Sequence, residues 1–149
     1  PTLGFVFAPE MARRLGHPDF APLGYSRKYW YDDALSEPVS SITSPGPDKR
    51  LYLDPNLAPR VGGARVAVVD DALSTGKTTA AAARLLERAG ADIAGVVVAM
   101  AQTTRWREGL DAASPGLSRR VAAVFGTPLF ELDPETGWTP IPGTHPDEA

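Results

Sequence analysis

Residues 65–101 contain a strand, a polar turn, a helix and a second strand, and this order constrains the fold more than any other part of the chain. Residues 65–69 (RVAVV) form a valine-rich run of the kind that is buried on both faces of a parallel sheet. Residues 78–89 carry alanines, leucines and charged residues, and Gly90 follows as a helix stop. Residues 94–101 are a second apolar run. The sequence therefore predicts an α/β fold with a mostly parallel central sheet flanked by helices.

The turn between the first strand and the helix ends in Gly76-Lys77-Thr78, the residues that close a nucleotide-binding P-loop. The P-loop pattern also requires a glycine at position 71. Asp71 occupies that position and brings a negative side chain to the place where glycine allows a tight turn around a polyphosphate. A P-loop ATPase or kinase is an alternative function, and it would require the chain to bind ATP despite Asp71.

The same turn has the polar groups of a different phosphate site. The hydroxyl-rich residues 74–79 (STGKTT) stand where a helix begins, so a phosphate can bind to the N–H groups of the turn and the helix N-terminus. Asp70 and Asp71 would repel that phosphate, and they suit neutral hydroxyls or a divalent cation. In open α/β sheets such turns form ligand crevices. The residues therefore predict a ligand with a phosphate at one end and vicinal hydroxyls near it, which describes a ribose 5-phosphate.

An apolar strand, Asp-Asp, two apolar residues and Ser-Thr-Gly-x-Thr together resemble the phosphoribosyl-diphosphate (PRPP) motif of type I phosphoribosyltransferases, closest to the adenine and purine enzymes. The resemblance implies that Asp70 and Asp71 are catalytic, bind the ribose 2′- and 3′-hydroxyls and hold Mg²⁺ through water. A plain strand followed by a helix cap would explain the apolar run but not the paired carboxylates. The residues that the resemblance assigns to the 5-phosphate are Ala72, Ser74, Thr75, Gly76, Lys77 and Thr78. Lys77 occupies a variable position of the motif.

Two further segments resemble the family. Thr2, Leu3 and Gly4 resemble its pyrophosphate loop, whose backbone N–H groups would receive the diphosphate, with a frayed terminus as the alternative. In the family this loop follows a first core strand, so we expect that strand to be missing from this chain. Arg27 and Lys28 follow a strand predicted over residues 20–25. They resemble an Arg-Lys pair near the diphosphate and the dimer interface, and are predicted to bind the diphosphate and act in catalysis.

The segment after Lys28 departs from the adenine enzymes. Tyr-Trp-Tyr-Asp-Asp at residues 29–33 replaces their Gly-Lys-Leu-Pro, so the acceptor base stays open, and the aromatic residues suit either a subunit interface or a base. Residues 36–50 are rich in Ser, Pro and Gly and predict a mobile segment. In the family the matching loop closes over the sugar, and Ser40, Ser41 and Thr43 would then reach the diphosphate. A solvated linker is the alternative.

The remaining elements follow from shorter patterns. We expect a helix over residues 5–15, a strand over 51–54, helical pieces over 103–110 and 121–125, and a last strand over 128–132. Residues 1–132 would form the core domain, N-terminally incomplete, and residues 133–149 a loosely ordered tail. His17 and His145 are too far from other ligating residues in the sequence to suggest a metal site or a triad.

Composition limits the class of protein. The 149 residues suit one domain, and the net charge of −3 gives no general attraction to nucleic acid or an anionic membrane. The chain has no cysteine, no signal peptide and no apolar run of transmembrane length, so we expect a cytoplasmic enzyme.

The predicted reaction is transfer of the 5-phosphoribosyl group from PRPP to a nitrogen of a base, purine favoured, with Mg²⁺ as cofactor and release of diphosphate. The family usually forms dimers, so a homodimer is expected. The alternative is a regulatory protein that binds PRPP without turnover.

Overall fold

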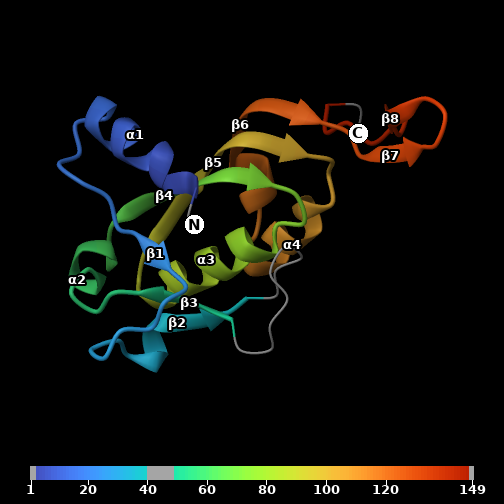
Figure 1. Ribbon diagram of the computed structural model, residues 1–149. Coiled ribbons are helices and arrows are strands. Elements are labelled where there is room, and N and C mark those ends of the chain that lie inside the picture. The colour runs from blue at the N-terminus through green and yellow to red at the C-terminus, as the bar shows by residue number, and fades with distance from the viewer. Residues whose placement is uncertain (1–2, 40–48, 148–149) are drawn as a thin grey trace.

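The central sheet of the domain is parallel. The computed structural model describes residues 3–39 and 49–147 (Figure 1). Strands β4 (Arg65–Leu73), β5 (Asp92–Gln102) and β6 (Val121–Thr127) form this sheet in the order β4-β5-β6. Both neighbouring pairs are parallel. The α/β fold predicted from the sequence is therefore confirmed.

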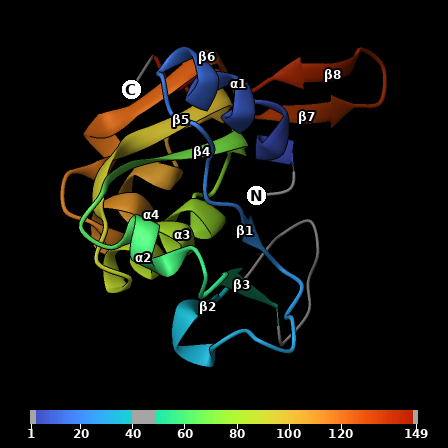
Figure 2. The same cartoon turned by 90° about the vertical axis from the view of Figure 1, so that its left-hand side faces the viewer.

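Helices cover both faces of this sheet. Helices α3 (Lys77–Arg88) and α4 (Trp106–Ala113) lie on one face, and α1 (Ala8–Arg14) lies on the other beside β4 (Figure 2). The 3-10 helix η3 (Leu117–Arg120) leads into β6. None of the helices in the described part of the chain is both long and apolar enough to cross a membrane.

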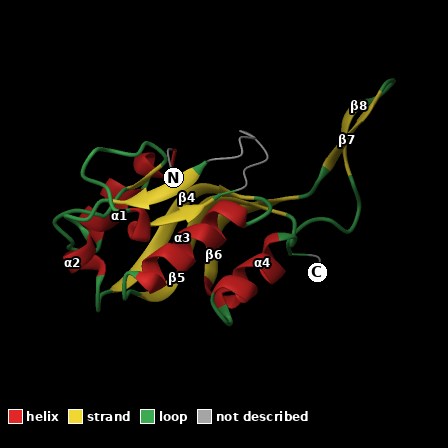
Figure 3. Cartoon of the chain, turned by 90° about the horizontal axis from the view of Figure 1, so that it is seen from below, coloured by secondary structure: helices red, strands yellow, loops and turns green. Residues whose placement is uncertain are grey.

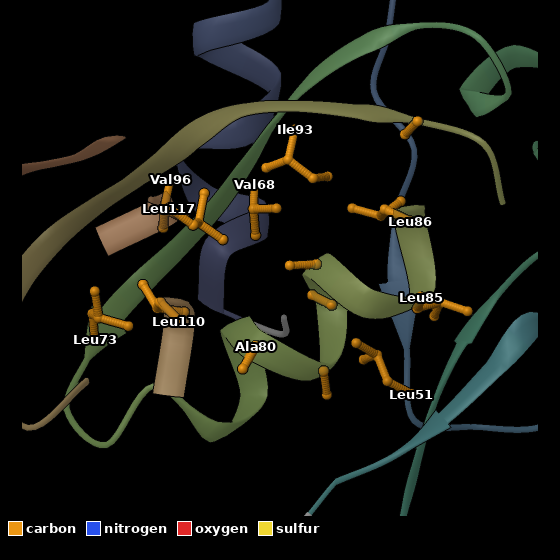
Figure 4. Close-up of a cluster of buried hydrophobic side chains, with 14 of the residues drawn as sticks. Leu51, Val68, Leu73, Ala80, Leu85, Leu86, Ile93, Val96, Leu110 and Leu117 are labelled. Atoms are coloured by element: carbon orange, nitrogen blue, oxygen red, sulfur yellow. The ribbon is translucent and has the colours of Figure 1, made fainter. Parts of the chain in front are cut away.

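The core fills the layer between α3, α4 and the sheet (Figure 4). Helix α3 presents four buried alanines, residues 80–83, so its backbone can lie close to the strands, and Leu85 and Leu86 fill the space at its far end. Val68, Ile93 and Val96 of the strands belong to the same buried cluster. This packing fixes where α3 begins, and the turn before it belongs to the predicted site.

A small antiparallel sheet lies beside α3. Its strands are β1 (Leu23–Gly24), β3 (Arg50–Leu53) and β2 (Ser36–Pro38), in that order. Glu37 of β2 is buried and pairs with two arginines of α3, Arg84 at 2.7 Å and Arg88 at 2.9 Å. Burial alone would raise the pKa of Glu37, but these guanidiniums hold it below its ordinary value. The ion pairs tie the small sheet to the central layer.

The expectation of a mobile segment over residues 36–50 is wrong at its ends. Residues 36–38 form β2, Val39 is buried, and β3 begins at Arg50, since pairing between the two strands overrides the Ser and Pro content. Ser40, Ser41 and Thr43 lie outside the described residues.

The helix expected over residues 121–125 is also wrong, because this segment is β6 and pairs along β5. The helix expected over 103–110 is confirmed with a shift to Trp106–Ala113. The predicted N-terminal helix is divided into the 3-10 helix η1 (Leu3–Val6) and α1. The 3-10 helix η2 (Asp33–Leu35) and α2 (Ala58–Val61) complete the helices of the described chain.

The C-terminal segment contains a β-hairpin in place of the loosely ordered tail. Strand β7 (Phe130–Asp133) pairs antiparallel with β8 (Gly137–Pro140), and the hairpin projects from the domain (Figure 3). The last predicted strand therefore exists but does not join the central sheet. Leu132 of β7 lies opposite Trp138 of β8, a cross-strand apolar pair that the short sequence pattern did not reveal.

Candidate functional site

The paired carboxylates stand on the last part of β4. The strand continues through Asp70 and Asp71 to Leu73, beyond the predicted end at residue 69. Asp70 is only 5 % exposed, and its Oδ1 accepts a hydrogen bond of 3.0 Å from the Asp71 amide. Because the strand is fixed on the sheet, both carboxyl groups are held at its carboxyl edge, where ligands of open α/β sheets bind.

Asp70 lies in a low-dielectric environment. A cavity of about 330 Å³ extends along β4 from α1, and Asp70 is one of its few charged lining residues among apolar side chains such as Phe5, Ala8 and Val68. Burial raises the pKa of Asp70, and the neighbouring Asp71 carboxyl adds to this effect. A ligand or cation that stabilises the ionised carboxylate therefore gains more here than it would from an exposed aspartate.

The N-terminal loop packs directly against Asp70. Gly4, in η1, is buried, and a Cβ at this position would lie 2.8 Å from the Val69 carbonyl oxygen and 3.0 Å from Asp70 Cα. Only glycine allows this approach of backbone to backbone. The structure thus brings Leu3 and Gly4, predicted for the diphosphate, next to the carboxylates, while Thr2 lies outside the described residues.

The predicted phosphate turn leads into the start of α3. Gly76 is the N-cap residue, with φ of +74°, and no side chain caps the helix. Its carbonyl oxygen accepts the first intrahelical bond, from the Ala80 amide at 2.7 Å. A helix start carries about half a positive charge, and the first-turn N–H groups have no intrahelical acceptor. Lys77 is exposed and Thr78 half-buried at this helix start.

The turn contacts the end of β5 and the start of α4. Ser74 Oγ donates a hydrogen bond of 2.8 Å to Gln102 Oε1 at the end of β5. Gly76 lies against α4, where a Cβ would be 2.9 Å from Trp106 Cβ. The indole of Trp106 is itself fixed, because Nε1 donates to the Thr103 carbonyl oxygen at 2.7 Å. These contacts hold the turn against the ends of β5 and α4. Ala72 and Thr75, also predicted for the phosphate, are half-buried in this segment.

Sequence reasoning missed four residues around the site: Gln102, Trp106, Tyr25 and Lys49. Gln102 could have been found, because it ends the strand next to β4 and so lies at the same sheet edge. Tyr25 follows β1, and burial raises the pKa of its phenol, with Asp70 and Asp71 adding to the effect. Lys49 Nζ stands 4.0 Å from the centre of the Tyr25 ring. No sequence pattern joins these segments, which meet only through the fold.

Arg27 and Lys28 stand apart from this cluster. Arg27 forms an exposed ion pair with Asp33 at 3.1 Å, and Lys28 Nζ donates to Ser26 Oγ at 3.4 Å. Within the described residues, neither side chain makes a hydrogen bond or ion pair to the carboxylates or to the turn. Their assignment to the diphosphate stays a prediction. Tyr29 is fully exposed, and Trp30 Nε1 donates to Asp54 at 3.3 Å.

Few side chains of the described chain are placed to bind a metal ion at this site. No group of three or more His, Asp or Glu side chains in the described chain could hold a metal ion. Asp70 and Asp71 offer hard carboxylate oxygens of the type that Mg²⁺ prefers, but only two residues provide them. They fit Mg²⁺ in a site that the ligand's own oxygens and water complete, as is usual for Mg²⁺ with phosphorylated substrates.

The site combines an uncapped helix start with two carboxylates at the carboxyl edge of a parallel sheet. These features define a class of α/β proteins whose crevice suits a phosphorylated, hydroxyl-rich ligand. Residues 1–130 match the family model described as the phosphoribosyl transferase domain. The chain therefore belongs to the phosphoribosyl transferase domain family, and the resemblance drawn from the PRPP motif is confirmed.

Relatives of known name cover different shares of the chain. The xanthine phosphoribosyltransferase of Chloroflexus aurantiacus is 34% identical over 127 residues, which are 85% of this chain and 52% of that protein. The adenine phosphoribosyltransferase of Clavibacter michiganensis is 57% identical over 44 residues, 30% of this chain and 23% of the relative. The chain thus spans about half the length of the xanthine relative, and the matches to adenine relatives are local.

Solved structures give the same fold. The adenine phosphoribosyltransferase of Thermoanaerobacter pseudethanolicus aligns with a TM-score of 0.62 at 24% identity, over 83% of this chain and 65% of its own. The enzyme from Trypanosoma brucei, solved with AMP, pyrophosphate and ribose-5-phosphate, aligns with a TM-score of 0.62 at 18% identity, over 81% and 50%. At these identities the alignment supports the fold alone.

We expect Gly76→Ala to lower stability more than a glycine substitution in open space. The new Cβ would meet Trp106 at 2.9 Å and would also occupy a left-handed backbone conformation. Together these effects cost about 2–4 kcal/mol in the free energy of unfolding, measured by urea denaturation. The control is Gly143→Ala, which has φ of +72° but nothing within 4 Å of its Cβ, so it isolates the backbone cost of about 1–2 kcal/mol. Equal losses of unfolding free energy in the two variants would contradict a close contact between position 76 and Trp106.

We expect Asp70→Asn to raise the melting temperature at pH 7. Burial lifts the pKa of Asp70 in the fold above the value of about 3.9 of an unfolded aspartate. Between these two values the folded chain binds the proton more tightly, so stability falls as pH rises through this window and stays lower above it. The gain from Asp70→Asn should therefore shrink as pH falls toward 3.

The control for this variant is Asp92→Asn on β5, whose exposed carboxylate lies 3.8 Å from Arg65 and contributes little. A lower melting temperature for Asp70→Asn at pH 7 would contradict the destabilising effect of this buried charge.

Proposed function

We propose that the protein transfers the 5-phosphoribosyl group of PRPP to a nitrogen of a purine base and releases diphosphate. The observation that carries the proposal is the contact of three segments: the carboxylates on β4, the uncapped start of α3 and the Gly4 loop against Asp70. These provide separate positions for hydroxyls, a monophosphate and a second anion. Family membership and the adenine and xanthine relatives support the acceptor class.

The residues would divide the work of a displacement at C1 of the ribose. The turn of residues 74–78 would bind the 5-phosphate through N–H groups and hydroxyls, and Asp70 and Asp71 would accept hydrogen bonds from the 2′- and 3′-hydroxyls. Backbone N–H groups near Leu3 and Gly4, with Arg27 and Lys28, would stabilise the departing diphosphate. No side-chain nucleophile is required, because holding the sugar, the leaving group and the base in line lowers the barrier.

Mg²⁺ belongs to the proposal as a cofactor. When bound, it would neutralise charge that develops on the diphosphate as the bond to C1 breaks. The buried Asp70 supports this assignment, since a cation near its carboxylate would offset the cost of ionising it. A cytoplasmic location and a homodimer are also proposed. The exposed aromatic residues Tyr29 and Trp30 support an interface, and contact with a base is their alternative role.

The test of this function is release of diphosphate by the full-length protein with PRPP, Mg²⁺ and a panel of bases. We expect release with adenine, hypoxanthine, guanine or xanthine and none with uracil or orotate. PRPP binding without release for any base would favour the regulatory alternative. Absence of PRPP binding by calorimetry would overturn both.

We expect Lys77→Ala to weaken PRPP binding less than Thr78→Val does. Lys77 is exposed at the helix start, so loss of its charge should cost less than about 1 kcal/mol. Thr78→Val removes a hydroxyl where the turn would meet the phosphate, and leaves a side chain of similar size. Calorimetric titration of both variants with PRPP measures the difference. The opposite order would favour direct phosphate binding by a P-loop lysine.

A further inference from the structure

Gln102 lies at the carboxyl end of the middle strand of the central sheet, and the proposed function gives it no role. Leu73 of β4 pairs with Ala101 of β5. The residues that come next in the two segments, Ser74 and Gln102, therefore follow the sheet side by side. On its other side Gln102 pairs with Thr127 of β6. The strand pairing thus brings the carboxamide of Gln102 to the turn that would bind the 5-phosphate.

The backbone around Gln102 is fixed. The amide of Thr103, the next residue, donates a hydrogen bond of 2.9 Å to the Thr127 carbonyl oxygen, and the Thr103 carbonyl oxygen accepts one of 2.7 Å from Trp106 Nε1. Among the described residues, Thr103 is also the one non-glycine residue with a positive φ, +57°. A residue keeps such a conformation where the surrounding contacts impose it. Gln102 therefore extends from a rigid strand end, and its terminal amide is the part that can turn.

One hydrogen bond joins Gln102 to the turn. Ser74 Oγ donates to Gln102 Oε1 at 2.8 Å, and both residues are half-buried. A serine hydroxyl has one proton and two lone pairs, whereas an ionised phosphate offers only acceptors. In this arrangement Ser74 gives its single proton to Gln102 and can offer only lone pairs to an anion. Binding of a phosphate through Ser74 requires the opposite direction of hydrogen bonding.

We propose that Gln102 is a positioning residue that reverses this hydrogen bond when a phosphomonoester binds, so that Ser74 donates to the phosphate. A carboxamide carries an acceptor oxygen and a donor NH₂ group on the same carbon, and a half turn of its last torsion exchanges the two. After that turn Gln102 Nε2 donates to Ser74 Oγ, and the serine proton is available to the phosphate. A carboxylate could only accept, and an apolar side chain could do neither. The inference rests on the proposed function, since it requires a phosphate at this turn.

The test is a double-mutant cycle on the full-length protein, with ribose 5-phosphate as the probe and calorimetry as the measurement. Gln102→Met keeps the length of the side chain and removes the carboxamide, and we expect about a three- to tenfold loss of affinity. Because Gln102 acts through Ser74, the variant with both Gln102→Met and Ser74→Ala should bind no more weakly than Ser74→Ala alone. Direct contact of Gln102 with the phosphate, or a merely structural role, would instead weaken binding in both backgrounds.

A second variant, Gln102→Glu, has the same shape, but its ionised carboxylate only accepts hydrogen bonds. It would keep the Ser74 proton and bring a negative charge to the turn, so we expect weaker binding than in Gln102→Met. The matched control is Ser118→Ala in η3, at the amino edge of the sheet. It removes a hydroxyl that donates to Asp111 Oδ2 at 2.7 Å, and the affinity for ribose 5-phosphate should equal that of the unmodified protein.

Unchanged affinity in Gln102→Met or in Gln102→Glu, or additive losses in the cycle, would overturn the inference while leaving the proposed function intact. Failure of the unmodified protein to bind ribose 5-phosphate or PRPP would overturn the proposed function and this inference with it.

Discussion

The parallel pairing of β4 with β5 is the interaction on which the site depends. It places Asp70 opposite Val98 and Leu73 opposite Ala101, so the chain leaves β4 beside the end of β5. Ser74 then reaches Gln102, and the turn enters α3 against Trp106. Because the buried alanines of α3 fix the helix on the same two strands, the position of the helix start is determined by the core rather than by the loop itself.

Several residues of the predicted site lower the stability of the fold. Asp70 lines the cavity beside β4, where burial disfavours the charged form of its carboxyl group. The left-handed Gly76 and the side-chain-free Gly4 likewise permit conformations that a typical residue would not adopt. At the predicted site these costs fall on residues that lie beside the carboxyl edge of the sheet, where strain of this kind often accompanies a ligand site.

The sequence was sufficient for the parts of the molecule that depend on neighbours in the chain. The strand, turn and helix over residues 65–89 follow a local pattern, and the resemblance to the PRPP motif rests on the same residues. The local pattern predicts a helix for the residues of β6, because their pairing with β5 is non-local, and the β7–β8 hairpin depends on a partner strand that the short pattern does not reveal. No local pattern points to Tyr25, because its place beside Lys49 depends on the pairing of β1 with β3.

The two ends of α3 are held by different kinds of contact. Near the helix C-terminus, Glu37 of β2 binds Arg84 and Arg88, and the buried carboxylate makes this connection costly to break. At the N-terminus the helix start lies against α4 through Gly76 and Trp106, and the turn before it donates one neutral hydrogen bond, from Ser74 to Gln102. A neutral hydrogen bond contributes about 1 kcal/mol, less than a buried ion pair costs to break. The far end of α3 is therefore anchored by charge, whereas its start depends on close packing and on the strand end beside it.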